Sequence, residues 1–475
     1  MMNKSDLNSL TLLLTFILMT VTSACATPDA ATEEADPAHE ADPEVTAIDD
    51  DYEASKLDSI FAEMDYEEQP GVVAGVFEQG DMIYNQSLGL ANLDHNITLS
   101  DSSRFFMGEL SKQVTAAAAG VLIHRDSLGM DDSISDFIDE WPDWAEEIRI
   151  EHLIYHTSGL PEVYELIDIT DHNIADPMDL DEYIEIITKA EELNFEPGSE
   201  FKYNNSGYKI LAGIIENVAD KDLNEFAKEV LFEPLGMDET HIQVDRSKVV
   251  PNRVISYSGR NNNYRQEYMN MFQGYGPVGM YTSLRDIKKW EQMRVNEDPL
   301  GKGRDFRDLL ITAGSTNNGE EVDYAFGKHL GSWKGQDYSG HDASFMGYRH
   351  YYRHFPEHEI SVLVMSNRSG FNAQSLVEEI AELLLDQELK AWMEPYTGSF
   401  YNDELDVTYE LKTKDGRLYL NRPHSDESTL SYDDVDKWSM GSWEFVFDGS
   451  DNHKAERFKL STGRAREVEF VRKND

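Results

Sequence analysis

Apolar and polar positions change their pattern several times along the 475-residue chain. Residues 10–21 are a short run of apolar residues and threonines, and residues 25–55 carry acidic side chains but no Lys or Arg. From about Leu57 the pattern becomes that of a folded protein. The stretches GVVAGVFEQG (residues 71–80) and DMIYNQSLGLAN (residues 81–92) predict two strands joined by a turn. The pattern therefore indicates a flexible amino-terminal region followed by the beginning of a sheet.

Helical periodicity follows these two strands. Apolar side chains recur with the spacing of one helix face from Lys112 to His124, and again around residues 208–215. The stretch ISVLVMSN (residues 360–367) predicts a buried strand, and a helix is expected from about Gln374 to Gln387. Strands thus lie at both ends of a mostly helical middle. We therefore expect an α+β fold, with one antiparallel sheet that distant segments complete and that helices flank.

The pattern changes again near the carboxyl end of the chain. Short runs of alternating apolar and polar residues follow, with a turn at residues 414–416. This alternation is typical of an all-β module made of short strands. We expect a main domain at residues 56–388 and a small β-barrel-like domain at residues 389–475.

The charge of the chain excludes some classes of partner. It has 41 Lys and Arg against 91 Asp and Glu, a formal net charge of −50 at pH 7. A protein that binds nucleic acid or anionic lipid headgroups needs a basic face, so neither partner is expected. The acidic residues are scattered, which favours a highly solvated surface over an acidic partner site. Such a surface also suits a salty habitat.

The amino terminus has the features of a targeting segment. Its apolar run is too short to span a membrane and suits a secretory signal peptide, so residues 1–24 are expected to be removed. Cys25 is the only cysteine, which excludes an internal disulfide. The residues before it resemble a bacterial lipoprotein cleavage box, which predicts a lipid anchor on Cys25 and residues 25–55 as a flexible tether. The alternative is ordinary cleavage after Ala24 or Ala26. The expected locations are the periplasm or outer membrane, with membrane contact through the anchor alone.

Five separated stretches occur in an order that points to one family. They are SKQVTAAAAGVLIHRDSLGMDDSISDFIDEWP (residues 111–142), IRIEHLIYHTSGLP (148–161), YNNSGYKILAGIIENVAD (203–220), GPVGMYTSLRDIKKW (276–290) and GHDASFMGYRHYYRHFPEHEISVLVMSN (340–367). Together they resemble the serine β-lactamase-related family, which includes class C β-lactamases, penicillin-binding D-alanyl peptidases and related esterases. The resemblance covers roughly residues 55–385, and the tail looks like the β-barrel module often appended in this family.

The resemblance implies acyl transfer. In the family, a serine at the start of a buried helix attacks a carbonyl, and a lysine one turn later takes part in the proton transfers. A tyrosine and an asparagine of a Y-x-N motif, a strand with K-T-G or H-x-G, and two backbone N–H groups that hold the oxyanion complete the site. By resemblance, these roles fall to Lys112, Tyr203 and Asn205, His341, and the N–H groups of Glu109 and Ser344.

The chain departs from the family pattern at two positions. Glu109 stands where the serine nucleophile is expected, and Ala343 replaces the glycine of H-x-G, with Asp342 before it. Ser111 does not have a lysine three residues later and so cannot take over the role of nucleophile. We also expect no displaced S-x-x-K at the start of another helix.

These substitutions have direct chemical consequences. An ionised carboxylate has no proton to give up, and its attack would yield a mixed anhydride instead of a durable ester. We expect Glu109 to pair with Lys112 and hold the lysine in its charged form. The Cβ of Ala343, which glycine lacks, reduces the space in which a ligand can come close to the strand backbone. Asp342 either repels a substrate carboxylate or points away from the cleft.

Two functions remain open from the sequence. The first is a pseudoenzyme of the cell envelope that binds or scaffolds through the retained pocket; in it Lys112 is an ion-pair partner, while Tyr203, Asn205 and His341 form structural contacts. The second is an active hydrolase of a β-lactam, D-alanyl peptide or ester with altered machinery. In it Glu109 acts as general base on water together with Lys112, and Tyr203 or His341 assists. The expected ligand is a peptidoglycan-like peptide or a small ester or amide. No cofactor and no metal site are expected, because the histidine spacings, including that of His350 and His354, match no metal motif.

Overall fold

The computed structural model describes residues 50–473 except 63, 65, 139–140, 171–177, 261–262, 268–273, 296–299 and 449–453. The predicted signal peptide, Cys25 and most of the predicted tether lie outside the described residues. Helix α1 (Asp50–Ala62) begins inside the predicted tether, so the last residues of that segment are helical instead of flexible.

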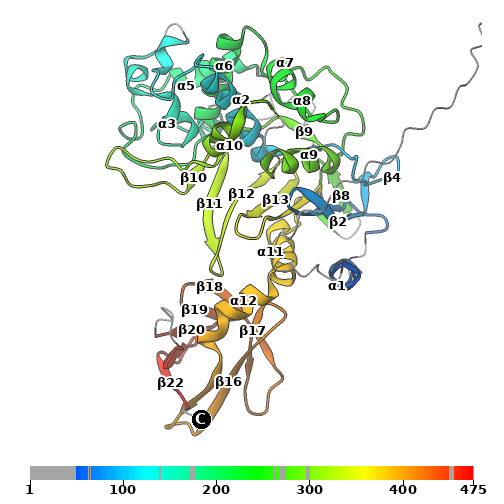
Figure 1. Cartoon of the computed structure of the whole chain (residues 1–475), viewed down its shortest axis with the longest axis vertical. Coiled ribbons are helices and arrows are strands. Elements are labelled where there is room, and N and C mark those ends of the chain that lie inside the picture. Colours follow the sequence, from blue (N-terminus) through cyan, green and yellow to red (C-terminus); the bar gives the residue numbers. More distant parts are fainter. Residues whose placement is uncertain are drawn as a thin grey trace, which may run out of the picture. The chain divides into compact units, whose positions relative to one another are not determined.

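The main domain is built on a seven-stranded antiparallel sheet (Figure 1). Strand β1 (Val72–Glu78) pairs with β2 (Asp81–Leu88) on one side and with the distant β14 (Ile360–Ser366) on the other. The predicted sheet closed by distant segments is therefore confirmed. The remaining strands, which continue outward from β14, are β13 (Tyr348–Phe355), β12 (Gln336–Phe345), β11 (Lys328–Trp333) and β10 (Tyr324–Ala325).

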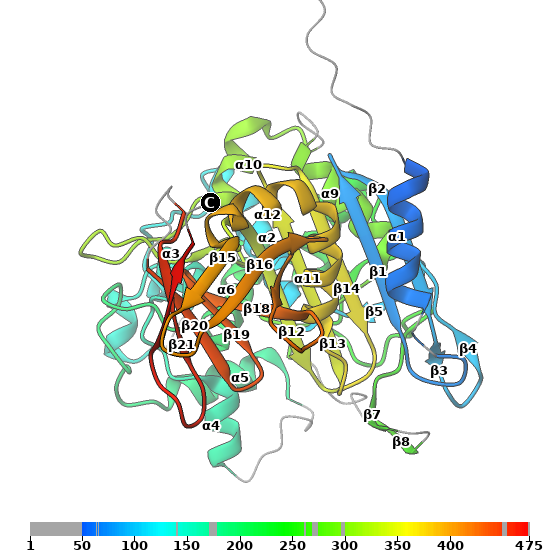
Figure 2. The same ribbon diagram turned by 90° about the horizontal axis from the view of Figure 1, so that it is seen from below.

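The central strands β1 and β14 are buried on both faces of the sheet, to which their successive side chains point alternately. In β1, Val73 and Phe77 pack in one hydrophobic core with α2 (Lys112–His124) and α9 (Leu284–Val295). Val72, Ala74 and Val76 pack in a second core with α1 and α11 (Ala373–Leu384). Figure 2 shows α1 and α11 lying over the sheet. This double burial explains why β1 and β14 are almost continuously apolar.

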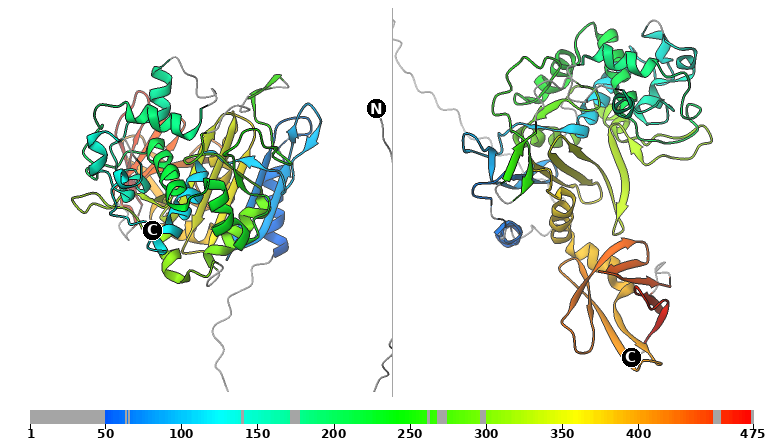
Figure 3. Two further views of the ribbon diagram at one scale, coloured as in Figure 1. Left: turned by 90° about the horizontal axis from the view of Figure 1, so that it is seen from above. Right: turned by 180° about the vertical axis from the view of Figure 1, so that it is seen from behind.

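Side chains from the helical middle of the chain pack in the first of these cores. Figure 3 shows these helices gathered on one side of the sheet. Helix α2 has the predicted bounds, and the second predicted helix is longer than its apolar face suggested. The elements of this region are η1 (Gly108–Ser111), η2 (Ile134–Asp136), η3 (Asp143–Glu147), α3 (Ile150–Ile154), α4 (Val163–Ile169), α5 (Leu180–Thr188), α6 (Asn205–Ala219), α7 (Leu223–Ala227), the π-helical η4 (Lys228–Phe232), α8 (Glu233–Leu235) and α10 (Gly303–Ile311).

Three small sheets accompany the main sheet. Strand β5 pairs with β9, which also pairs with β6, next to the turn that begins α2. The strands of these sheets are β3 (Leu90–Asn92) with β4 (Ile97–Thr98), β5 (Phe105–Phe106) with β9 (Met280–Thr282) and β6 (His241–Ile242), and β7 (Tyr257–Arg260) with β8 (Asn263–Gln266).

The carboxyl-terminal region contains the predicted β-barrel. The single helix expected from about Gln374 to Gln387 is instead two helices, α11 and α12 (Asp386–Met393), and α12 crosses the predicted domain boundary. After η5 (Glu394–Tyr396), eight strands form a closed barrel in which the first strand also pairs with the last. They are β15 (Gly398–Asn402), β16 (Val407–Lys414), β17 (Arg417–Asn421), β18 (Ser428–Asp434), β19 (Lys437–Met440), β20 (Trp443–Phe447), β21 (Arg457–Ser461) and β22 (Val468–Arg472).

Each helix among the described residues is too short or too polar to span a lipid bilayer.

Candidate functional site

A tight turn at the amino end of α2 places Glu109. Gly108 adopts a positive φ of 53°, and a Cβ there would lie 3.1 Å from the Cβ of Ala343. The Ser111 hydroxyl donates to the Gly108 carbonyl (2.6 Å) and accepts from the Met280 N–H (3.0 Å). These bonds tie η1 to β9 and give Ser111 a structural role. The turn therefore needs glycine at position 108, and it holds Glu109 beside β12.

The carboxyl group of Glu109 is desolvated. Its Oε2 atom is buried and has no hydrogen-bond partner in the described part of the chain. Burial raises the pKa of Glu109 above its ordinary value, and the charge of Lys112 opposes this rise. Hydrogen bonding from the backbone N–H groups of Glu109 and Ser344 also lowers this pKa. The two N–H groups assigned to the oxyanion by resemblance therefore interact with the Glu109 side chain itself.

Lys112 lies fully buried behind this carboxyl group. Its Nζ donates to Asn205 Oδ1 (2.7 Å) and to the Pro277 carbonyl (3.4 Å), and it lies 4.7 Å from the centre of the Tyr203 ring. Burial lowers the pKa of Lys112 to about 8, although the charge of Glu109 raises it. The cation is thus stabilised by an amide, a carbonyl and a ring face.

Glu109 favours the charged form of Lys112, as expected, but it does not hold the pKa of the lysine at its ordinary value. The carboxylate does favour the cation, but desolvation by burial is the larger effect, so the pKa of Lys112 falls below its ordinary value. Among the ion pairs of the described residues, none within 4.0 Å joins Glu109 to Lys112. Lys112 therefore keeps the lowered pKa that a proton-transferring lysine needs.

Glu162 is a site residue that the sequence analysis missed. Its carboxylate accepts from the Asn205 backbone N–H (2.6 Å) and from Asn205 Nδ2 (3.0 Å), and it also accepts from the Tyr164 N–H at the start of α4. The resulting chain of hydrogen bonds runs from Lys112 through Asn205 to Glu162. It fixes the Asn205 amide with its oxygen toward Lys112. An acidic residue directly before a helix was the available signal.

Tyr203 lies beside Lys112 and has an unsatisfied hydroxyl. The Tyr203 hydroxyl is buried and has no hydrogen-bond partner within the described residues. Its ring lies 4.5 Å from the ring of His156 and stacks on His329 at 5.6 Å. Burial, together with the charges of Glu109 and Asp342, raises the pKa of Tyr203 well above its ordinary value. The phenol therefore stays neutral near pH 7 and can donate a hydrogen bond to a ligand.

Strand β12 supplies the residues matched to H-x-G. His341 and Ala343 are buried, whereas Asp342 and Ser344 are exposed, as the alternation of a strand requires. The His341 Nδ1–H donates to the Asp342 carbonyl (2.6 Å), and Nε2 lies 3.3 Å from the Tyr324 hydroxyl. Burial and the charge of Lys112 lower the pKa of His341 well below its ordinary value.

Beside these residues lies an open cavity of about 270 Å³. Its lining includes Phe201, His329, His341 and the exposed Asp342. Asp342 is close enough to act on the protonation of Glu109 and raises its pKa. The Asp342 charge therefore reaches the cleft, although the side chain is exposed.

The expectation of no other S-x-x-K at a helix start is wrong. Ser206 and Lys209 have this spacing in the first turn of α6. Both are fully buried: the Ser206 hydroxyl donates to the Pro161 carbonyl (2.6 Å), and Lys209 Nζ lies 3.6 Å from the centre of the Tyr183 ring. Neither group reaches the cleft, so this pair does not replace the missing nucleophile.

Three other histidines of the motifs are structural. His156 has a positive φ of 60°, and its Nδ1 accepts from the Asn204 N–H (3.2 Å). On β13, His350 bonds to the Phe106 carbonyl (2.8 Å), and His354 Nδ1 lies 3.1 Å from the Ser361 hydroxyl. One ring nitrogen of each histidine thus contacts the fold, whereas His156 Nε2 and His350 Nδ1 are buried without a hydrogen-bond partner among the described residues.

Comparison with known proteins shows to which family this architecture belongs. The Beta-lactamase family matches residues 57–387. The chain belongs to the Beta-lactamase family. This family member is 27% identical over 380 residues to Penicillin-binding protein 4* of Bacillus subtilis, with 72% of this chain and 82% of that protein covered. The predicted relationship to serine β-lactamase-related hydrolases is therefore confirmed.

Two further comparisons agree with this assignment. A D-aminopeptidase of Gluconobacter oxydans is 22% identical over 340 residues, with 72% of this chain covered; the match spans 63% of that protein's length. The octameric penicillin-binding protein homologue from Pyrococcus abyssi has the same fold, with a TM-score of 0.60 at 21% identity, and the match covers 90% of this chain and 100% of that one. The predicted fold, a β-lactamase-like domain followed by a small β-barrel, is confirmed.

Proposed function

We propose that this Beta-lactamase family member binds a small peptide or amide in its cleft and does not carry out serine acyl transfer. One observation carries the proposal. At the helix start where the family pattern has its nucleophilic serine, the chain has Glu109, whose carboxyl group interacts with the N–H groups of Glu109 and Ser344. The attacking hydroxyl is replaced, and a carboxyl group lies beside the N–H groups that would hold the oxyanion.

The chemistry of the carboxyl group supports this proposal. Stabilisation of the oxyanion requires N–H donors that are free to meet the negative charge as it develops. A carboxylate next to these donors competes with the substrate oxygen and repels its developing charge. Loss of one such donor costs roughly a hundredfold or more in rate in other acyl-transfer enzymes. Glu109 affects both donors and the nucleophile at once.

The retained groups favour a peptide or amide ligand. The unsatisfied Tyr203 hydroxyl offers a donor, and the buried Lys112 offers positive charge below pH 8. The names of the relatives above refer to penicillin binding and to a D-aminopeptidase. We therefore propose a peptidoglycan-like peptide with D-residues, or a small ester or amide, as ligand, bound by a protein held at the cell envelope through Cys25.

A second function is an active hydrolase that uses Glu109 as general base on water. The raised pKa of Glu109 favours it, because a carboxylate with a higher pKa is a stronger base. Lys112, with a pKa of about 8, would then assist in proton transfer. This second function has one difficulty. The Glu109 carboxylate lies beside the N–H groups, so a water molecule and the substrate must both fit around it.

Turnover assays separate the two functions. We expect purified protein to hydrolyse neither a p-nitrophenyl ester nor a D-alanine p-nitroanilide above the buffer rate, while calorimetry detects binding of D-alanyl-D-alanine that Tyr203→Phe weakens. Glu165→Gln, an exposed position on α4, is the control. Turnover that disappears in Lys112→Ala would overturn the proposal. A bell-shaped pH profile that loses its acidic limb in Glu109→Gln would establish the second function.

A further inference from the structure

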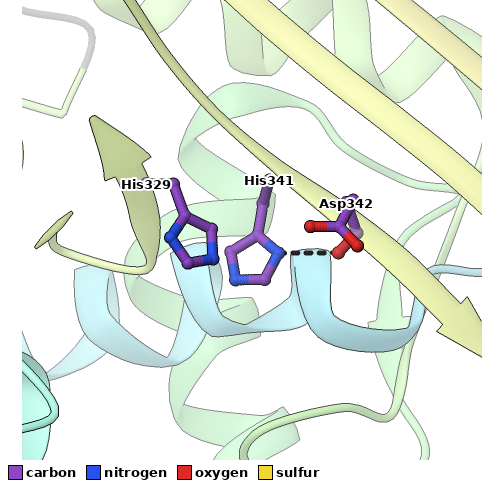
Figure 4. A group of neighbouring side chains, drawn as sticks. All are labelled: His329, His341 and Asp342. Atoms are coloured by element: carbon purple, nitrogen blue, oxygen red, sulfur yellow. Dashed lines mark hydrogen bonds between the residues drawn. The ribbon is translucent and has the colours of Figure 1, made fainter. Parts of the chain in front are cut away.

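We propose that His329, His341 and Asp342 form a binding site for one divalent transition-metal ion at the edge of the cleft. One ligand atom from each residue lies within 4.8 Å of those of the other two. Figure 4 shows the two imidazole rings side by side, with Asp342 next to His341. The inference is independent of whether the cleft turns over a substrate.

The hairpin of β11 and β12 creates this cluster. His329 on β11 pairs with Gly340 on β12, so His341 follows directly after the partner of His329. The centres of the two imidazole rings are 4.7 Å apart. His329 and His341 are twelve positions apart in the sequence. The expectation of no metal site rested on shorter spacings, such as that of His350 and His354. Strand register, which the sequence did not reveal, brings the three groups together.

The donor set fits a borderline divalent ion. Two imidazoles and one carboxylate are ligands of Zn²⁺ and of neighbouring first-row ions. Zn–N and Zn–O bonds of about 2.0–2.1 Å in a tetrahedron put ligand atoms about 3.3 Å apart. Side-chain torsions alone can close the remaining distance, because Asp342 is exposed and His329 only partly buried.

His329 and His341 each have a ring nitrogen that can bind a metal ion. The His341 Nδ1–H donates to the Asp342 carbonyl (2.6 Å), which leaves the Nε2 lone pair for a metal and fixes the ring, as is usual for metal-binding histidines. The Tyr324 hydroxyl, 3.3 Å from that Nε2, can turn to Tyr208, with which it also interacts. In the part of the chain that the structure describes, the His329 ring nitrogens make no hydrogen bond; its ring is held by stacking on Tyr203.

An ion at this place would change what the cleft can bind. Three protein ligands leave one position of a tetrahedral ion open, and the same residues line the open cavity of about 270 Å³. The cation of Lys112 opposes a second positive charge, whereas the carboxyl groups of Glu109 and Asp342 favour it. The open position would accept a carboxylate or carbonyl oxygen of a bound ligand.

Direct metal titration tests the site. The full-length chain is titrated with Zn²⁺ in competition with a chromophoric chelator, so that weak binding to the acidic surface is not counted. We expect one tight ion per chain, with affinity at least about tenfold weaker in His329→Ala and in Asp342→Asn. Loss of a mere hydrogen-bond partner of a metal ligand already costs 10–100-fold in other proteins. His95→Ala, at an exposed turn, serves as the control and should leave affinity unchanged.

Two results would overturn the site: no tight ion in the wild-type chain, or one whose affinity is the same in Asp342→Asn. Asp342→Asn tests the site even if His329→Ala disturbs the fold. Asp342 is exposed, and the asparagine side chain has nearly the same shape as aspartate. Replacement of Zn²⁺ by Co²⁺ adds a spectroscopic readout. The visible absorption of Co²⁺ should show nitrogen and oxygen ligands without sulfur, and a thiolate band would assign the ion to Cys25.

Discussion

At the scale of single residues, the protein separates two groups that an acyl-serine enzyme uses together. Lys112 keeps the burial and the lowered pKa of a proton-transferring lysine, with Asn205 and Glu162 holding it in place. Glu109, three residues earlier, brings a carboxyl group that has no proton to give in its ionised form. The site therefore retains the lysine and replaces the group on which it would act.

The protonation of Lys112 is a residue-level prediction. Lysine NMR with ¹³C at Cε should show two lysines titrating near pH 8, Lys112 and the buried Lys328, against an ordinary value of 10.5. The Lys112 signal is assigned by its absence in Lys112→Ala. In Glu109→Gln the pKa of Lys112 should fall further, because the carboxylate that favours the cation is removed. Glu165→Gln, exposed on α4, should leave it unchanged. A pKa near 10.5 in the wild type, or a rise in Glu109→Gln, would contradict the electrostatic account.

The same shift has a defined effect on stability. The folded chain releases the Lys112 proton near pH 8, whereas an unfolded chain holds it to about pH 10.5. Between these values the unfolded state binds more protons, so the contribution of Lys112 to stability rises with pH. Below pH 8 the buried cation lowers stability by a constant amount.

At the scale of elements, Asn367 joins three segments that are distant in the sequence. Directly after β14, its side chain accepts from the Gly71 N–H (2.7 Å) and donates to the carbonyls of Leu90 (3.0 Å) and Ile255 (2.8 Å). All four segments meet beside the junction of β1 and β14. The buried side-chain amide of Asn367 thus provides hydrogen-bond partners for backbone groups at the place where the pairing of β1 with β14 ends.

Removal of this amide should be costly. Asn367→Ala leaves an N–H and two carbonyls without partners, and each unsatisfied buried group costs about 1–3 kcal/mol. We expect the free energy of unfolding to fall by about 3 kcal/mol or more, measured by urea denaturation of the main domain. Asn263→Ala, exposed on β8 of the same domain, is the matched control and should change little. Equal midpoints for both variants would show that the junction does not depend on Asn367.

The elements also show what the sequence could and could not predict. Helix α2 was predicted with its bounds, because its apolar face and its motif agree, and the barrel was predicted from alternation and turns. The break at Leu385 was missed, since apolar periodicity continues through α11 and α12. The pKa of Lys112 and the proximity of His329 to His341 depend on burial and strand register, which one sequence does not contain.

At the scale of the whole molecule, the charge is the dominant feature. A formal net charge of −50 on 475 residues keeps the protein soluble and makes like charges repel across the folded surface. Most ion pairs of the described residues are exposed, and such pairs contribute little to stability. The compact state therefore carries an electrostatic cost that salt can reduce.

Salt should stabilise this protein. The Debye length falls from about 10 Å at 0.1 M to about 3 Å at 1 M ionic strength, which screens the repulsion between surface carboxylates. We expect the thermal unfolding midpoint to rise between low and roughly 1 M NaCl, and to rise equally in choline chloride because screening does not depend on the cation. A flat or falling midpoint would contradict a fold limited by self-repulsion.

Covalent turnover is the central question, and intact-mass spectrometry after incubation with penicillin measures it most directly. The account predicts that the wild-type mass stays unchanged, whereas Glu109→Ser, which supplies a hydroxyl next to Lys112, gains one penicilloyl group. Glu109→Gln should remain unmodified, since it removes the charge without supplying a hydroxyl. A stable penicilloyl adduct on the wild-type chain would contradict the account.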